Sequence, residues 1–201
     1  MPEQRDQYHH GNLRAEAIAA ALALLANPSA AGFTMRAVAD ACGVAHRAIA
    51  AQFTDRAGLE AAVAATGFDR LYSLLANARN APTFLRAFAG FAMAEPALYD
   101  LMMRQDYGMF GRDAHLRASA DRVIARSIAT LAPAADNPTS ARRQVMRFWM
   151  LLHGGVTLHR SGILHARNDA DFIEELLAIA ALDGRPAPIA QPLSATERPD
   201  R

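Results

Sequence analysis

The stretch from Thr34 to Phe53 constrains the fold more than any other part of the chain, because it has the pattern of two short helices joined by a glycine turn. Thr34 can cap the first helix, since its hydroxyl can accept a hydrogen bond from a free amide of the opening turn. Gly43 can adopt the left-handed backbone that a sharp turn between helices needs. Ile49 and Phe53 lie one turn apart on the second helix and predict its buried face. The pattern predicts a helix-turn-helix, whose second helix can enter the major groove of DNA.

The rest of the chain indicates an all-α protein. Glycine and proline fall mostly between segments of helical periodicity, and alternating strand patterns are absent. About nine helices are predicted, over residues 12–26, 35–42, 46–53, 56–79, 96–103, 113–131, 139–161 and 169–182, with a further one that begins at Pro82 and continues through Phe91. We expect a helix-turn-helix domain at 1–56, a helical regulatory and dimerisation domain at 57–183, and a proline-rich, disordered tail at 184–201.

Composition excludes several classes of protein. The chain has 201 residues, of which 52% are hydrophobic and 20% charged, as is typical of a globular protein. One cysteine allows no internal disulfide, and neither a signal peptide nor an apolar run of membrane-spanning length is present, so we expect a cytoplasmic protein without a membrane partner. The sequence contains no phosphate-binding glycine loop, Cys/His metal array or nucleophile motif. We therefore expect no enzyme activity, no cofactor and no metal.

Four segments in the same order and spacing resemble the TetR family of bacterial transcription regulators. They are TyrHisHisGlyAsnLeuArg at 8–14, the segment 33–44, GluProAlaLeuTyrAspLeuMetMet at 95–103 and PheTrpMetLeuLeuHisGlyGly at 148–155. The last two resemble a branch whose regulatory domain carries a Trp, His, Gly signature. The resemblance implies a homodimer that reads a near-palindromic operator in double-stranded DNA and releases it when a small-molecule effector binds. It implies DNA contacts from Thr34, Arg36, Ala45, His46, Arg47, Gln52 and Arg56.

The reading motif departs from the family pattern at its contact positions. Ala45, Ala50 and Gln52 stand where the family usually has Ser, Tyr and His, and the first two of these often contact phosphates. Residues 1–60 hold five arginines and six acidic residues, whereas a DNA-binding domain is usually basic. Arg47 can read guanine, contact a phosphate or remain solvated. These features predict DNA binding through few phosphate contacts, and the alternative is a dimeric small-molecule sensor or interaction protein of the same fold with weakened DNA binding.

A ligand pocket is predicted from aromatic, histidine and methionine side chains of the second domain. Trp149 and His153 lie one turn apart on one helix face, where they can line a pocket or pack in the core. A methionine- and aromatic-rich segment before them suits an adaptable apolar pocket, although core packing explains it equally well. The candidate residues are Met102, Met103, Tyr107, Phe110, His115, Trp149 and His153.

The segment from Thr139 to Ser161 is apolar on nearly all sides in its middle, so we expect it to be buried by its own domain and by another surface. Gly154 and Gly155 cost helix stability, which close approach of a partner subunit or of a ligand would explain. The predicted dimer interface comprises Leu152, Gly155, Val156, His159, Ile173, Leu176 and Leu177. Together these features predict a ligand-responsive, homodimeric repressor.

Overall fold

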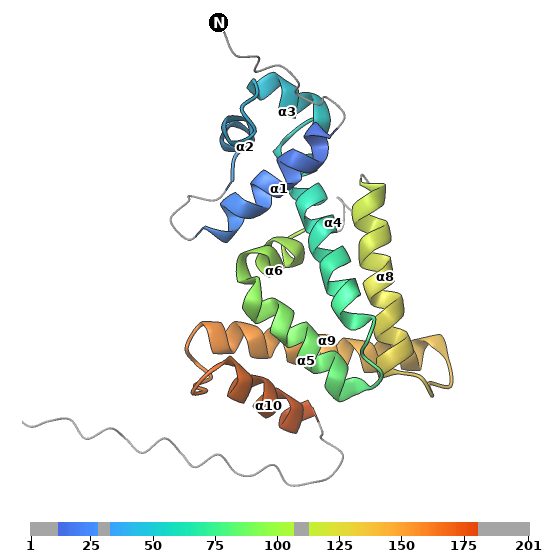
Figure 1. Ribbon diagram of the computed structural model, residues 1–201. Helices are drawn as coiled ribbons and strands as arrows, with labels where there is room; N and C mark the ends of the chain where they lie inside the picture. Colours follow the sequence, from blue (N-terminus) through green and yellow to red (C-terminus); the bar gives the residue numbers. More distant parts are fainter. Residues whose placement is uncertain (1–11, 28–32, 107–112, 181–201) are drawn as a thin grey trace, which may run out of the picture.

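The computed structural model describes residues 12–27, 33–106 and 113–180 of the chain. Within these ranges the protein has nine helices and no strand, so the predicted all-α fold is confirmed there (Figure 1). The tail predicted at 184–201 lies outside the described residues. The helices are α1 (Leu13–Ala26), α2 (Met35–Ala41), α3 (His46–Phe53), α4 (Arg56–Leu75), α5 (Ala81–Ala94), α6 (Pro96–Met103), α8 (Ala114–Leu131), α9 (Pro138–Arg160) and α10 (Asp169–Ala180). None of them has the length and apolar character needed to cross a membrane.

Polar side chains set the first residue of most of these helices. A side-chain oxygen accepts a hydrogen bond from a free amide of the first turn, which removes one of the unsatisfied donors at a helix start. Asn80 and Thr83 do so reciprocally and form a capping box at the start of α5. The capping residues are Thr34 for α2, Asp55 for α4, Asn80 for α5, Asp113 for α8 and Asn137 for α9. The cap predicted at Thr34 is therefore confirmed.

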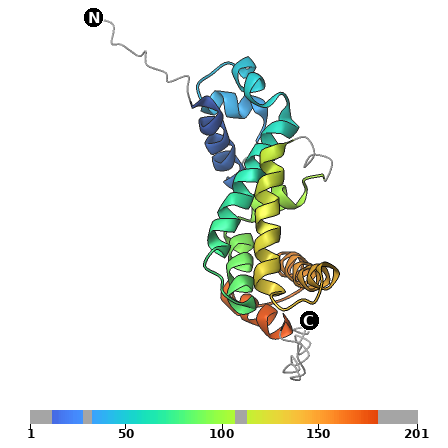
Figure 2. The same ribbon diagram turned by 90° about the vertical axis from the view of Figure 1, so that its right-hand side faces the viewer.

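The long helix α4 connects the two ends of the molecule and lies beside α8 over most of its length (Figures 1 and 2). Its predicted extension toward Arg79 is wrong, since α4 ends at Leu75. Arg126 of α8 explains this end, because its guanidinium donates to the carbonyl oxygens of Leu75, Ala76 and Ala78 at 3.0, 2.9 and 2.5 Å. These bonds satisfy carbonyls that a longer helix would otherwise have paired.

Helices α1–α3 form one end of the molecule, and α5, α9 and α10 lie at the other (Figure 1). Helix α1 packs against α2, α3, α4 and α6, so its contacts extend beyond the first three helices. One continuous hydrophobic core runs from Ala17 in α1 to Leu176 in α10. Buried side chains therefore connect the helix-turn-helix to the C-terminal helices.

Ion pairs on the surface hold the C-terminal helices to their neighbours. Arg86 of α5 makes two hydrogen bonds of 3.0 Å to the carboxylate of Glu174 in α10. Arg160, at the end of α9, binds both carboxylate oxygens of Asp100 in α6 at 2.6 and 2.8 Å. Bidentate pairs of this kind fix orientation as well as contributing energy, so they set the register of α10 and α9 against α5 and α6.

Candidate functional site

The helix-turn-helix forms as the sequence predicts. The Thr34 hydroxyl accepts a hydrogen bond from the Ala37 amide at 3.1 Å, and Gly43 has the expected positive φ of 66°. Val38 and Ile49 are fully buried, so the two helices share a tight apolar contact. This packing leaves the opposite face of α3 exposed at the end of the molecule.

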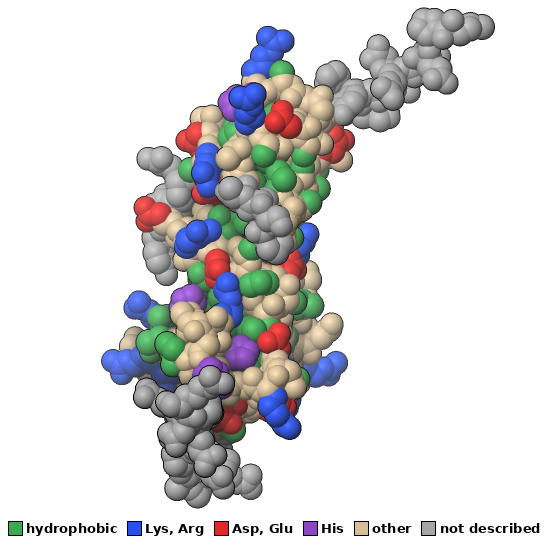
Figure 3. All heavy atoms as spheres, turned by 90° about the vertical axis from the view of Figure 1, so that its left-hand side faces the viewer, with side chains coloured by type: hydrophobic (Ala, Val, Ile, Leu, Met, Phe, Trp, Pro, Cys, Tyr) green, Lys and Arg blue, Asp and Glu red, His purple; other side chains and the backbone are tan. Residues whose placement is uncertain are grey.

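All seven predicted DNA-contact residues lie on the surface of this end, where arginine and histidine side chains gather in Figure 3. Within the described part of the chain, Arg36, His46 and Arg47 have no hydrogen-bond or ion-pair partner, so their polar groups are available to another molecule. Arg56 is already paired, because its Nε donates to Glu60 at 2.8 Å. The surface therefore offers few uncommitted positive charges.

Arg14 of α1 has a structural role that the sequence did not indicate. Its guanidinium donates to the carbonyl oxygen of Gln52 at 2.6 Å and lies over the ring of Phe53, 4.6 Å from the ring centre. Both contacts join α1 to the last turn of α3, where a positive charge also favours the helix end. No local spacing could reveal this pair, because the partners are 38 residues apart in sequence.

The junction between α3 and α4 has a backbone geometry that few residue types adopt readily. Thr54 has a φ of 65° and a ψ of −58°, and the Asp55 amide donates to the Phe53 carbonyl across it at 2.7 Å, which makes a strained γ-turn. Gly58 is required beside this turn, because a Cβ there would overlap the Phe53 carbonyl oxygen. The junction fixes α3 relative to α4.

Aromatic side chains from three helices meet between α5, α6 and α9. The Tyr99 hydroxyl and Nδ1 of His153 share a hydrogen bond of 3.0 Å, and the ring of Phe88 lies 6.0 Å from Tyr99 and 6.5 Å from Trp149, centre to centre. Burial, together with the nearby Asp100 carboxylate and against the opposing effect of Arg160, raises the pKa of Tyr99 above its usual range. Among the described residues, Trp149 Nε1 is the buried side-chain nitrogen or oxygen that lacks a hydrogen-bond partner.

The other predicted pocket residues that the structure describes do not join this cluster. Met102 is buried against α4, where a Cβ on Gly67 would lie 2.5 Å from its sulfur. His115 lies on the surface beside Asp69 of α4, with 3.4 Å between Nε2 and the carboxylate. Met103 is half-buried, and Tyr107 and Phe110 lie outside the described residues. The structure brings Trp149 and His153 together and places Met102 and His115 against α4.

The face predicted for the dimer interface is largely the inner face of one chain. Leu152, Val156 and Leu176 are at most 2% exposed within a single subunit. Gly155 allows Leu176 of the same chain to approach, since a Cβ on Gly155 would overlap Cδ2 of Leu176. The expectation that a partner subunit explains Gly155 is therefore corrected: its close neighbour is α10 of its own chain.

The remaining predicted interface residues are also engaged within the chain. His159 stacks on Phe172 with 4.1 Å between ring centres, and its two ring nitrogens face the Leu164 carbonyl and the Asp169 carboxylate at 3.1 and 3.3 Å. Ile173 and Leu177 are half-buried. The periodicity of α9 did not distinguish its inner from its outer apolar face, because both are apolar.

The outer face of α9 carries an exposed apolar stripe, which we define as Met146, Met150, Gly154 and Leu158. These residues follow one another at intervals of four and so share a face of the helix. The side chains of Met146, Met150 and Leu158 are 42, 63 and 40% exposed, and a Cβ on Gly154 would meet no atom within 4 Å. Ile163, just beyond α9, is 69% exposed.

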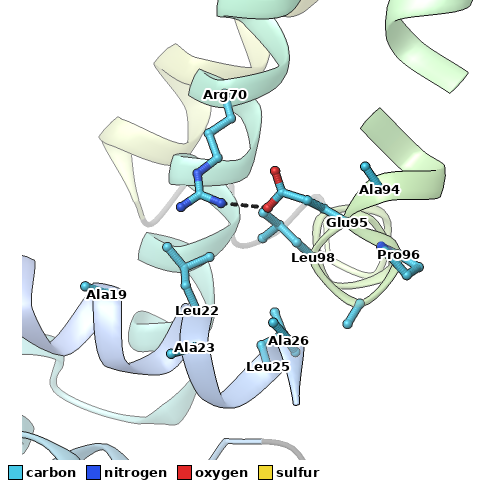
Figure 4. Close-up of a pocket in the computed structure, with 11 residues that line it drawn as sticks. Ala19, Leu22, Ala23, Leu25, Ala26, Arg70, Ala94, Glu95, Pro96 and Leu98 are labelled. Carbon is cyan, nitrogen blue, oxygen red and sulfur yellow. Dashed lines mark hydrogen bonds and ion pairs between the residues drawn. The ribbon is translucent and has the colours of Figure 1, made fainter. Parts of the chain in front are cut away.

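An apolar groove of about 420 Å³, which we call the α1–α6 groove, lies between α1 and the start of α6 (Figure 4). An ion pair between Arg70 Nη1 and Glu95 Oε2 at 2.6 Å borders it. The sequence did not indicate this groove. Its lining residues are Ala19, Leu22, Ala23, Leu25, Ala26, Arg70, Ala94, Glu95, Pro96, Ala97 and Leu98.

Comparison with protein families identifies the C-terminal helices. Residues 82–180, which span α5–α10, match the model of the tetracyclin repressor-like C-terminal domain. The chain belongs to the TetR family. The resemblance inferred from sequence is thus confirmed at the level of the family, whose matched domain includes the aromatic cluster and the α9 stripe.

Solved structures extend this TetR-like fold over most of the chain. A protein of unknown function from Rhodococcus sp. RHA1 is 26% identical, with a TM-score of 0.67 over 86% of this chain and 94% of that one. The putative regulatory protein SCO4313 is 19% identical, with a TM-score of 0.66 over 90 and 99%. The multidrug binding protein EbrR, complexed with imidazole, is 20% identical, with a TM-score of 0.52 over 86 and 94%. No curated protein sequence matches the chain.

Proposed function

We propose that this protein is a homodimeric, ligand-responsive transcription regulator that represses genes by binding a near-palindromic operator. The observation that carries the proposal is the exposed face of α3, which presents His46 and Arg47 without partners in the described part of the chain, on a fully packed helix-turn-helix. Such a helix fits the major groove, where arginine can form a bidentate pair with guanine. This role places the protein in the cytoplasm, with double-stranded DNA as its partner.

Dimerisation is supported by the exposed stripe on α9. A soluble protein rarely leaves several large apolar side chains together on one helix face unless another surface covers them. The stripe lies on the opposite side of α9 from the buried Leu152 and Val156, so a second subunit can cover it without disturbing the core. We propose that α9 and α10 form the interface through this outer face, with Ile173 and Leu177 at its border.

Effector binding is supported by the aromatic cluster. The unpaired indole nitrogen of Trp149 offers a hydrogen-bond donor to a ligand acceptor, and an unsatisfied buried donor is otherwise costly. Trp149 and His153 remain our candidates for the pocket wall, with Met103, Tyr107 and Phe110 as further candidates. EbrR, which has this fold, is described as binding multiple drugs, and this supports a small organic molecule as the effector.

The decisive experiment is a fluorescence-anisotropy titration of the protein with its own upstream DNA and with a scrambled duplex of equal length. We expect saturable binding to the upstream duplex, and a loss of about tenfold or more in Arg47→Ala. Arg79→Ala, which changes an arginine in the connection between α4 and α5, is the matched control and should bind as the wild type does.

The alternative function is a dimeric sensor of the same fold without sequence-specific DNA binding. The near-balanced charge of residues 1–60 and the alanines at positions 45 and 50 favour it. Equal affinity for upstream and scrambled duplexes, or no binding to either at physiological salt, would support this alternative and overturn the regulator.

A further inference from the structure

We propose that the α1–α6 groove is a binding site for a small monocarboxylate with an apolar body, such as a medium-chain fatty acid. This site is separate from the aromatic cluster of the C-terminal domain. The ligand site itself stands on the geometry of the groove, whereas its effect on DNA affinity rests on the proposed function.

The outer face of α1 shows that something apolar belongs in this groove. Residues 17–26 are all apolar, yet only Ala17 and Ala21 of α1 are buried. Ala19, Ala23 and Ala26 remain exposed and line the groove at i, i+4 and i+7 spacing. A helix that is apolar on all sides is normally covered on more than one side, and among the described residues no apolar neighbour covers this face across the groove.

The size of the groove fits a small molecule. Its volume of about 420 Å³ falls in the range of known ligand pockets, which is roughly 300–1,000 Å³. Alanines on both sides create the space, and Figure 4 shows the side chains of α1 on one side of it and Leu98 of α6 on the other. A slender hydrocarbon chain can therefore lie between the two helices.

Arg70 and the start of α6 give the groove its preference for an anion. Arg70 uses one nitrogen, Nη1, to bind Glu95, and its other guanidinium nitrogens have no partner in the described part of the chain. Helix α6 has no side-chain cap, so free amides of its first turn also lie at this wall. The Glu95 carboxylate offsets the charge of Arg70, so the groups that favour a carboxylate are the unused N–H donors of Arg70 and the free amides of α6.

The groove is mechanically connected to the DNA-reading helix. A ligand there would contact α1 on one side and α6 on the other. At its opposite end α1 holds α3, because Arg14 donates to the Gln52 carbonyl and stacks on Phe53. A bound ligand would therefore restrain α3 relative to α6. It changes DNA affinity if it binds the DNA-bound arrangement of these helices and the free arrangement with unequal affinity.

The test uses isothermal titration calorimetry of the full chain with octanoate, and with octan-1-ol as the uncharged analogue. We expect saturable octanoate binding in the wild type and about tenfold weaker binding in Arg70→Gln, with octan-1-ol unaffected by that change. Ala23→Leu should abolish binding of both by filling the groove. Ala15→Leu, an exposed position of α1 outside the groove, should bind as the wild type does.

The outcomes separate the site from the proposed function. The site is overturned if octanoate does not bind, or if it binds Ala23→Leu as well as it binds the wild type. It is also overturned if light scattering shows a lower oligomer mass for Ala23→Leu, because a second copy of the chain would then fill the groove. Octanoate should change the affinity for upstream DNA severalfold in the wild type but not in Ala23→Leu. Binding of octanoate without any DNA binding refutes the proposed function alone, and DNA binding unaffected by bound octanoate overturns the coupling.

Discussion

The reading head, formed by α1–α3, and the C-terminal pair, formed by α9 and α10, differ in what they leave exposed. No large hydrophobic side chain in the described part of the reading head is exposed, whereas Met146, Met150 and Leu158 on α9 all are. The reading head presents polar groups, with few uncommitted charges. The contrast fits the two partners that we propose: DNA for the polar surface of the reading head, and a second subunit for the apolar surface of the C-terminal pair.

The largest expected effect is a loss of stability from a substitution at the junction between the reading head and α4. Gly58→Ala should lower the free energy of unfolding by about 2–3 kcal/mol, because the new Cβ overlaps the Phe53 carbonyl oxygen and the backbone must move. The control is Gly90→Ala in α5, where a Cβ meets no atom within 4 Å and helix propensity improves. Urea unfolding at one fixed protein concentration measures both, and equal stability of the two variants would refute the described junction.

A charge on the outer face of α9 tests the C-terminal pair. Met150→Arg should weaken dimerisation by about 100-fold, since an unpaired charge would be buried between subunits. Leu74→Arg, at an α4 side chain that is 51% exposed, is the matched control and should leave the dimer intact. Sedimentation equilibrium gives the dimer dissociation constants of both variants. An unchanged dissociation constant for Met150→Arg would show that the interface lies on another face.

The two neighbouring glycines of α9 sharpen the same test. Gly154→Leu should weaken the dimer while the subunit stays folded, because the space beside Gly154 is open within one chain. Gly155→Leu should instead destabilise the subunit by about 2 kcal/mol, since its side chain would displace Leu176. Circular dichroism measures the stability of each variant, and light scattering measures its dimerisation. A stable but monomeric Gly155→Leu and an unstable Gly154→Leu would show that Gly155, and not Gly154, faces the partner subunit.

A smaller effect is expected where the reading head stores strain. Thr54→Gly should raise the free energy of unfolding by about 1 kcal/mol, because glycine adopts the positive φ of 65° without steric cost. Thr83→Gly, in the first turn of α5, is an opposing control and should be destabilising, since it removes the capping box. Destabilisation by Thr54→Gly would show that the turn is not strained.

The smallest expected effect is a pH dependence in the aromatic cluster. The pKa of Tyr99 is raised in the folded protein above the ordinary value of 10.0, so the unfolded chain loses this proton first as the pH rises. The stabilisation from Tyr99 is complete below about pH 10 and declines above it. Urea unfolding between about pH 8 and about pH 11 should show a smaller decline in Tyr99→Phe than in the wild type, and identical declines would contradict the raised pKa.

Sequence reasoning succeeded where the cause of a structure is local. The cap at Thr34 and the turn at Gly43 follow from rules that act within a few residues, and the structure reproduces them. It failed where the cause is tertiary. The apolar periodicity of α9 could not show that Gly155 faces Leu176 of the same chain.

The candidate sites divide in the same way. The exposed residues of α3 follow from the positions of Ile49 and Phe53 on its buried face, which the sequence shows directly. The α1–α6 groove is lined by residues of α1, the end of α5 and the start of α6, which are far apart in sequence, with Arg70 contributed by α4. Short side chains such as alanine carry no pattern that distinguishes a wall of a groove from an ordinary helix face.

The most direct test of the reading head is the salt dependence of its affinity for upstream DNA. In the described part of the reading head the uncommitted arginines are Arg36 and Arg47, so a dimer brings four such charges and we expect specific binding with a shallow dependence on salt. A plot of log K against log salt concentration should have a slope of smaller magnitude than about 5, which corresponds to fewer than about six phosphate contacts. A steeper slope, or a slope and affinity shared equally by scrambled DNA, would contradict specific reading through few phosphate contacts.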